Sequence, residues 1–342
     1  MIGGWRACDA CGATWASCAD GPCPLCGEPL QAMEPPLRPV EPGLVVPATV
    51  DGAEARRRLL AFTGQVAFPS GGLVSDNTAQ RLSLVFLPRW LVDVHARGTF
   101  RLEAGFEVEV RGTVETWSLG RWVGHQTSEH RLHWEPRVGR LERDYVALPV
   151  RARTEGEDLV GALVDPFPES VPFDPATHVA PILLPDREPD ERWPAAFDVL
   201  RSRVAEHAAE ACGAVTVRAL ELELEDGPVR WAWELLPVWV TRYRDEEGGQ
   251  HLLLVHGTTG LAVGPRMASA STAAAHARTA SLLAAGLGVT GTLVGLLGLL
   301  IWVLQPVSAL CLIGALAAGA RSLLLPHRVA TWNRHQLNPE DP

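Results

Sequence analysis

Residues 280–325 contain a single charged side chain, Arg321, and this apolar stretch constrains the fold more than any other part of the chain. As one helix it would be about 70 Å long, more than twice the roughly 30 Å core of a bilayer. We therefore expect two helices, at about 280–303 and 307–325, joined by a tight turn at 303–308. The sequence predicts a C-terminal transmembrane helical hairpin.

Arginines flank this predicted hairpin on both outer sides, whereas the turn between its helices carries no charge. They are Arg266 and Arg278 before it, then Arg328 and Arg334 after it. By the positive-inside rule both ends of the hairpin face the cytoplasm. We expect a multi-pass protein of the bacterial inner (cytoplasmic) membrane, with residues 326–342 as a cytoplasmic tail. A buried helical hairpin in a soluble protein is the alternative.

Small residues follow one face of the first predicted span, and Gly291 and Gly295 would let another helix approach closely. The simplest neighbour is the second span, which offers Gly314, Ala315 and Gly319. A homo-oligomer through Gly291 and Gly295 is the alternative.

Four of the seven cysteines form two Cys-x-x-Cys knuckles, each followed by glycine: Cys8 and Cys11 with Gly12, and Cys23 and Cys26 with Gly27. Two such pairs can clamp a tetrahedral Zn²⁺, and the glycines let the backbone turn so that amide groups reach the thiolates. We predict one structural zinc ion in a ribbon over residues 1–30, folded by metal binding. Cys18 is left over and is interpreted as a buried thiol, with a replacement ligand as the alternative.

Two other roles for these cysteines are less favoured. A disulfide framework needs an oxidising compartment, and residues 1–20 contain no apolar signal region. A thioredoxin-like redox site would have one active pair rather than two matched knuckles. The reduced cysteines that zinc needs agree with the cytoplasmic side inferred from the arginines.

The sequence contains no lysine, so all 30 basic residues are arginine. This excludes a Walker A loop, a protein kinase site and pyridoxal-phosphate chemistry, each of which needs a lysine amine. The formal charge of −10 argues against a protein whose whole surface follows nucleic-acid phosphates.

Between the ribbon and the hairpin the sequence predicts a linker and a mixed body. Residues 31–48 are rich in proline and indicate a semi-extended linker that leaves the ribbon mobile. Residues 49–265 are expected to form an α+β body, with helices from Asp51 and over about 190–211 and alternating strands elsewhere. The predicted fold class is α+β, rich in strands.

A weak internal repeat runs through this body. Residues 86–92 and 235–241 share the pattern Leu-Pro-x-Trp within a strand. A duplicated α+β unit, with copies at about 50–155 and 156–265, would explain the match. Chance is the alternative.

The ribbon, the strand at 87–91, the stretch at 171–175 and the segment from Leu236 to Gly260 together resemble an uncharacterised family of bacterial zinc-ribbon membrane proteins. Members are often labelled primosomal helicase-like from the ribbon alone. In the family a Pro-Val-Trp strand leads to a Val-Asn-Gly-Gln-Thr-Gly turn and then to two membrane spans, whereas here His256 and Thr258 replace the Asn and Gln. The resemblance implies this architecture but no activity, and the missing Walker A lysine rules out the helicase label.

The best enzymatic candidate is a histidine group, formed by His125, His130 and His133 beside Glu129 and Glu135. In a strand His130 and His133 point to opposite faces, so they do not form a ready chelate. We interpret them as surface histidines on a β-hairpin, with a catalytic or second metal site as the alternative.

These observations favour a non-catalytic protein: a membrane-anchored binding or scaffolding module for a protein partner. One alternative is a membrane-tethered nucleic-acid binder that uses the ribbon, supported by Arg6 and the arginines at 56–58. Another is a metal-dependent hydrolase that uses the histidine group.

Overall fold

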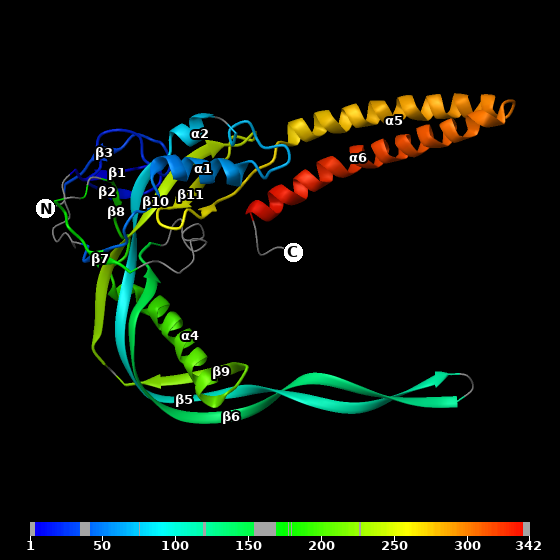
Figure 1. The fold of residues 1–342 in the computed structure, drawn as a ribbon. Coiled ribbons are helices and arrows are strands. Elements are labelled where there is room, and N and C mark those ends of the chain that lie inside the picture. The colour runs from blue at the N-terminus through cyan, green and yellow to red at the C-terminus, as the bar shows by residue number, and fades with distance from the viewer. Residues whose placement is uncertain are drawn as a thin grey trace.

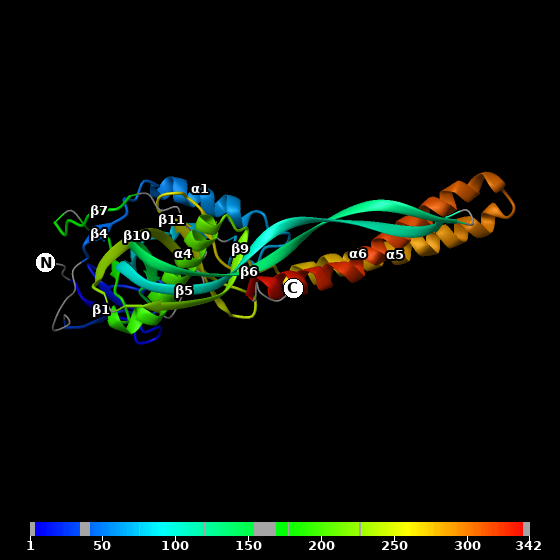
Figure 2. The same ribbon diagram turned by 90° about the horizontal axis from the view of Figure 1, so that it is seen from below.

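The computed structural model describes residues 4–34, 42–74, 76–118, 121–153, 169–176, 178, 180–225 and 227–337. A body of strands and helices carries two projections, a two-stranded arm and a helical hairpin, which extend toward the same side (Figures 1 and 2). The predicted α+β class is confirmed, because the sheet is mixed, a cysteine cluster lies near the N-terminus and two apolar helices lie at the C-terminus.

Twelve described strands form one sheet. Its main path runs β12 (Ala262–Val263), β11 (Gln250–His256), β10 (Val229–Arg244), β5 (Ser83–Ser118), β8 (Ile182–Leu183), β2 (Thr14–Ala16), β1 (Arg6–Ala7) and β3 (Gln31–Ala32). Beside this path, β6 (Arg121–Arg151) and β9 (Thr216–Leu224) pair with β5, and β4 (Leu44–Val45) pairs with β10 and with β7 (Val171–Pro172). The pairings are antiparallel except β10 with β4 and β5 with β8.

Helices cover the sheet of the body; two lie where the sequence predicts them, from Asp51 and over about 190–211, and a third, short one was not predicted. They are α1 (Gly52–Thr63), α2 (Asp76–Gln80) and α4 (Trp193–Cys212), the last entered through the 3₁₀ turn η1 (Asp190–Arg192). Asp51 caps α1 by accepting a hydrogen bond from the backbone N–H of Glu54. Leu200 and Val204 of α4 are buried in the largest core cluster, and Gly213 ends the helix with φ +66°.

The two Leu-Pro-x-Trp segments are direct neighbours in the sheet. Leu87 of β5 pairs with Leu236 of β10, and the antiparallel register places Pro88 and Pro237 symmetrically about that pair. The segments are therefore related by a local two-fold axis through Leu87 and Leu236. This pairing gives the sequence match a structural counterpart over these residues.

Both prolines lie where a strand changes its outer partner. The N–H of Phe86 donates to the carbonyl of Pro181, just before β8. The nitrogen of Pro88, two residues further, therefore faces the same edge of β5, between β8 and β6. The carbonyl of Pro237 accepts from Gly257 on the edge where β4 gives way to β11. Proline is tolerated at these two central positions because no ladder hydrogen bond is needed there.

The structure differs from the expected flexible linker after the ribbon. Residues 31–32 form β3, which pairs with β1, and residues 44–45 form β4, which pairs with β10, while residues 35–41 lie outside the described part. The ribbon is also joined to the sheet, since Trp15 of β2 pairs with Leu183 of β8. Long-range strand pairing, which local composition does not reveal, fixes the ribbon to the body.

The arm is a two-stranded extension of β5 and β6. The two strands pair from Arg89 with Arg151 to Ser118 with Arg121, with one register shift between Val92 and Val94, and β9 covers β5 only as far as Gly105. Beyond that point the described strands have no third neighbour. Near the tip, Trp117 and Trp122 stack edge to face with ring centroids 5.3 Å apart, and both are more than half exposed.

The C-terminal hairpin consists of α5 (Ala270–Gly298), the 3₁₀ turn η2 (Trp302–Leu304) and α6 (Gln305–Leu337). Both helices are longer than predicted, and the turn falls at residues 299–304, about four residues before its expected position. The helices pack through the predicted glycine face. A Cβ atom at Gly291 would lie 3.1 Å from Cβ of Cys311, and Ser308 Oγ donates to the carbonyl of Gly291 at 2.7 Å.

The end of α6 packs against the body, so the predicted tail is in fact helical as far as Leu337. Trp332 Nε1 donates to the carbonyl of Arg266, and Asn333 forms two hydrogen bonds with the backbone of Ala268. The guanidinium of Arg266 lies over the rings of Phe62 and Trp332. These contacts anchor the base of the hairpin to α1 and to the segment before α5.

Candidate metal centre

The four predicted cysteine ligands converge at one point between two turns of the ribbon. The sulfur atoms of Cys8, Cys11, Cys23 and Cys26 all lie within 4.8 Å of one another, with Cys8 and Cys26 at 3.3 Å and Cys11 and Cys23 at 3.8 Å. Tetrahedral Zn²⁺ with Zn–S bonds of about 2.3 Å requires sulfurs about 3.8 Å apart. The donor set therefore fits a single tetrahedral metal ion.

The two knuckles share one backbone pattern. Gly12 N–H donates to the carbonyl of Cys8 at 2.9 Å, and Gly27 N–H donates to that of Cys23 at 2.8 Å. Both glycines have positive φ, +64° and +87°, where a side chain is strained. This confirms that each glycine provides the turn at its knuckle.

Burial of the cysteine cluster disfavours the charged thiolate form. Burial raises the pKa of Cys11 and Cys26, although backbone N–H groups of Ala13 and Glu28 partly offset it. At Cys8 burial also acts to raise the pKa, but hydrogen bonds from the backbone and from Cys26 outweigh it and lower the pKa. Four crowded thiolates therefore need a cation, which a bound metal ion would supply.

The centre lies against the main sheet. Cys8, Cys23 and Trp15 are buried in one cluster with Val238 and Leu254 of β10 and β11. Trp15 packs both on the cysteine turns and on the body. Cys18 is buried outside the group of four, and burial raises its pKa.

Two residues that the sequence reasoning did not identify hold the second knuckle. Arg242 Nη1 donates to the carbonyl of Cys23 at 3.1 Å, and Gln250 Nε2 donates to that of Cys26 at 2.6 Å. The Arg242 guanidinium also lies so close to Gly27 that a Cβ atom there would overlap it. Both residues are more than 200 positions away from the ribbon, so no local pattern could associate them with it.

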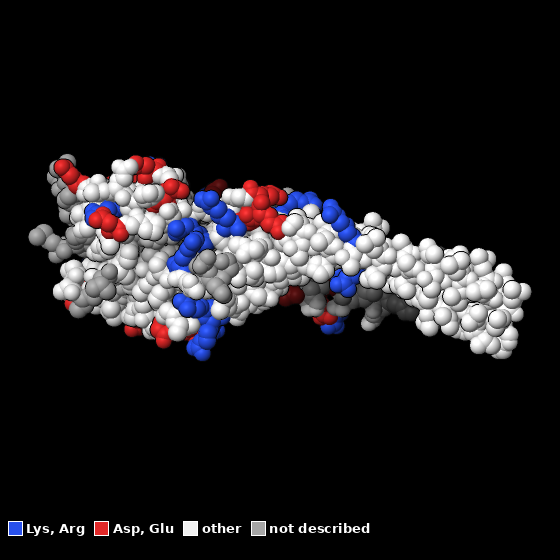
Figure 3. Space-filling view, turned by 90° about the horizontal axis from the view of Figure 1, so that it is seen from above, with Lys and Arg blue, Asp and Glu red and all other residues white. Residues whose placement is uncertain are grey.

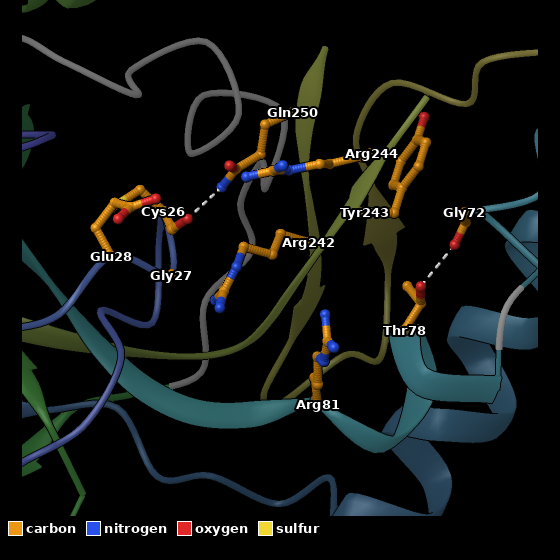
Figure 4. A pocket seen from close by; sticks show the side chains of 10 residues that line it. All are labelled: Cys26, Gly27, Glu28, Gly72, Thr78, Arg81, Arg242, Tyr243, Arg244 and Gln250. Carbon is orange, nitrogen blue, oxygen red and sulfur yellow. Dashed lines mark hydrogen bonds between the residues drawn. The ribbon is translucent and has the colours of Figure 1, made fainter. Parts of the chain in front are cut away.

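A cavity of about 330 Å³ opens between this knuckle and the sheet (Figure 4). One wall is the turn from Cys26 to Glu28, and the opposite wall contains Gly72 and Thr78. The side chains of Arg81, Arg242 and Arg244 surround the space between these walls (Figure 4).

His130 and His133, the two histidines of the predicted group whose side chains the structure describes, do not join a second cluster of metal-ligating groups. His130 and His133 lie on β6 in the arm, with exposed side chains 3.0 Å from Glu107 and 3.7 Å from Glu135 respectively. The interpretation as surface histidines on a β-hairpin is confirmed for these two, while the His125 side chain lies outside the described part. Among described residues, only the four cysteines bring three or more metal-ligating groups together.

His256, which stands where the resembled family has asparagine, organises the turn after β11. Its side chain is buried, and Nδ1 accepts hydrogen bonds from the backbone N–H groups of Thr258 and Thr259 at 3.0 and 3.3 Å. Residues 257–259 form this turn between β11 and β12. The imidazole caps the turn.

Comparison with known protein families, with curated proteins and with solved structures finds no match to this chain.

Proposed function

We propose that the protein is a non-catalytic, membrane-anchored module that holds a protein partner at the cytoplasmic face of a bacterial inner membrane. The exposed β5–β6 arm is the observation that supports partner binding most strongly. The proposal has three parts, a structural zinc ion, a membrane anchor and a binding arm, and each is supported by separate observations.

Cys8, Cys11, Cys23 and Cys26 would hold the zinc ion. When bound, the ion supplies a structural crosslink between the two knuckles. Four thiolate ligands leave no open position for water or substrate, which favours a structural over a catalytic role. Burial of the cluster against β10 and β11 also keeps solvent from two of the sulfurs.

The outer surface of the helical hairpin supports the membrane anchor. Leu282, Leu300 and Leu316 are each about three-quarters exposed or more, and most of both helices lies free of the body. Figure 3 shows charged side chains as far as the base of the hairpin and none on the visible face beyond it. A core helix of a soluble protein would bury these side chains, whereas lipid would cover them.

The exposed surface of the arm supports partner binding, because a partner would bury its apolar side chains and pair its backbone edges. Val108, Val110 and Leu132 are exposed on it, as is the Trp117–Trp122 pair at its tip. An isolated two-stranded ribbon is marginally stable and presents unpaired backbone edges to other proteins. Exposed tryptophan is typical of the centres of protein interfaces.

The position of the arm brings the partner close to the membrane. Arm and helices extend from the body to the same side (Figures 1 and 2). Glu107, Glu109 and Arg111 are exposed along the arm and would be costly in hydrocarbon. In the anchored protein these charged side chains would therefore keep the arm out of the hydrocarbon and at the membrane surface.

Photo-crosslinking in cells tests this proposal. A photoreactive residue at Val110, on the arm, is expected to capture a defined protein, whereas one at the exposed body residue Leu261 is expected not to capture it. Trp117→Ser with Trp122→Ser should reduce the capture at least severalfold. Equal capture from both positions, or capture of nucleic acid that falls with salt, would contradict the proposal.

A further inference from the structure

The cavity beside the second knuckle has an unusual charge for its size. Arg81, Arg242 and Arg244 line it together with one carboxylate, Glu28. Arg242 and Arg244 are two residues apart on β10 and therefore project from the same face of the strand. Its lining carries a net charge of about +2, in a chain whose net charge is −10.

Two of these arginines have no protein partner for their charge. Within the part of the chain that the structure describes, neither Arg81 nor Arg244 forms an ion pair or a side-chain hydrogen bond. Several other arginines of the body are ion-paired, as Arg218 is with Glu103 and Arg89 with Glu234. Unpaired guanidinium groups around a concave site are typical of sites that bind oxyanions.

The third arginine is held in place by the ribbon. Arg242 is fixed by its hydrogen bond to the carbonyl of Cys23, and its guanidinium occupies the space that a Cβ atom at Gly27 would take. Because one guanidinium carries five N–H donors, this bond leaves others directed to the cavity. The metal knuckle thus preorganises one wall of the cavity.

We propose that this cavity binds a phosphomonoester, with Arg81 and Arg244 as its principal ligands and Arg242 as a third, ribbon-held contact. The two excess positive charges match a phosphate dianion better than a single carboxylate. A volume of about 330 Å³ exceeds what a phosphate group alone fills and leaves room for an organic part. This site goes beyond the proposed function and does not depend on it.

Inorganic phosphate is the probe for the first test. Thermal unfolding of the detergent-purified full-length protein is measured with increasing phosphate at constant ionic strength. Phosphate is expected to raise the melting temperature, and Arg81→Gln with Arg244→Gln should weaken apparent phosphate binding roughly tenfold or more. The control variant, Arg140→Gln with Arg203→Gln, changes two exposed arginines outside the cavity and therefore has the same net charge as the cavity variant. It should leave apparent phosphate binding unchanged.

A second experiment distinguishes a lipid from a soluble source of the phosphomonoester. The protein is placed in nanodiscs of phosphatidylcholine with or without phosphatidic acid. A lipid headgroup as ligand predicts stabilisation by phosphatidic acid that the cavity variant loses, whereas a soluble ligand predicts stabilisation by added phosphate alone. The site is overturned if phosphate gives no stabilisation at millimolar concentration, or if the cavity and control variants respond alike.

Discussion

Arg242 donates a hydrogen bond to the carbonyl oxygen of Cys23, a residue 219 positions earlier in the chain. The bond joins β10, a central strand of the sheet, to the second metal knuckle. It is one of the contacts that join the ribbon to the body, although the sequence pattern resembles a separate module. This link predicts how substitution of the knuckle glycines changes stability and how removal of the metal changes hydrogen exchange in the sheet.

Gly27→Ala is expected to destabilise the protein more than Gly12→Ala. Both glycines have positive φ, so each alanine incurs backbone strain of about 1–2 kcal/mol. Only Gly27 also touches Arg242, whereas the space around Gly12 is open. Chemical unfolding of the two variants in detergent should show an additional loss of at least about 1 kcal/mol for Gly27→Ala. Equal losses would mean that the Arg242 contact adds nothing.

Removal of the metal is expected to loosen the sheet as well as the ribbon. Trp15 of the ribbon pairs with Leu183, and the ribbon shares a core cluster with Val238 and Leu254. Hydrogen exchange after treatment with a zinc chelator should therefore accelerate in β8 and in β10–β11, not only in residues 4–32. Exchange that changes in the ribbon alone would show that it folds independently of the body.

Asp245 is expected to stabilise the protein in a pH-dependent way. Burial would raise the pKa of this carboxyl, but the hydrogen bond with His251, at 2.7 Å, and bonds from the backbone of Gly249 and Glu247 together lower it. A lowered carboxyl pKa contributes stability above its unfolded value of about 3.9, and that contribution is lost as the pH falls through the folded pKa.

Asp245→Asn should accordingly cost about 1–3 kcal/mol at pH 7. The difference in unfolding free energy between the two proteins should shrink as the pH is lowered below about 4. Comparing the proteins at each pH cancels effects of acid on the metal centre. A difference that stays constant from pH 7 to pH 3 would contradict this role of the carboxylate.

The helical hairpin offers a matched pair of glycines. A Cβ atom at Gly291 would lie 3.1 Å from side-chain carbons of Cys311 and Leu312 on α6. Nothing lies within 4 Å of the position that a Cβ atom would take at Gly286. Gly291→Leu is expected to force the helices apart and cost about 1–3 kcal/mol, while Gly286→Leu should be nearly neutral. Thermal unfolding in the same detergent compares them. Similar effects of both variants would argue against this packing.

Local patterns sufficed for much of the architecture. The cysteine spacing predicts the four metal ligands, and the apolar stretch with its glycine face predicts two packed C-terminal helices, because each depends on residues close together in sequence. The glycine after each knuckle and the cap at Asp51 follow from the same kind of local rule.

Long-range pairing accounts for what sequence reasoning missed. A proline-rich segment predicts a free linker, yet β4 pairs with β10 through residues 190 positions apart. Arg242 and Gln250 support the metal knuckle from another part of the chain, and nothing near them marks that role. The length of the arm also follows from the register of β5 with β6, not from the alternation of side chains within either strand.

The most direct test of the central claim is a metal count on the purified full-length protein. One zinc per chain is expected, retained in His130→Ala with His133→Ala and lost in Cys8→Ser with Cys11→Ser. The account predicts that the cysteine variant also has a lower melting temperature, because the sheet loses the support of the ribbon. Zinc that persists in the cysteine variant, or that is lost with the histidines, would contradict a structural centre at the four cysteines.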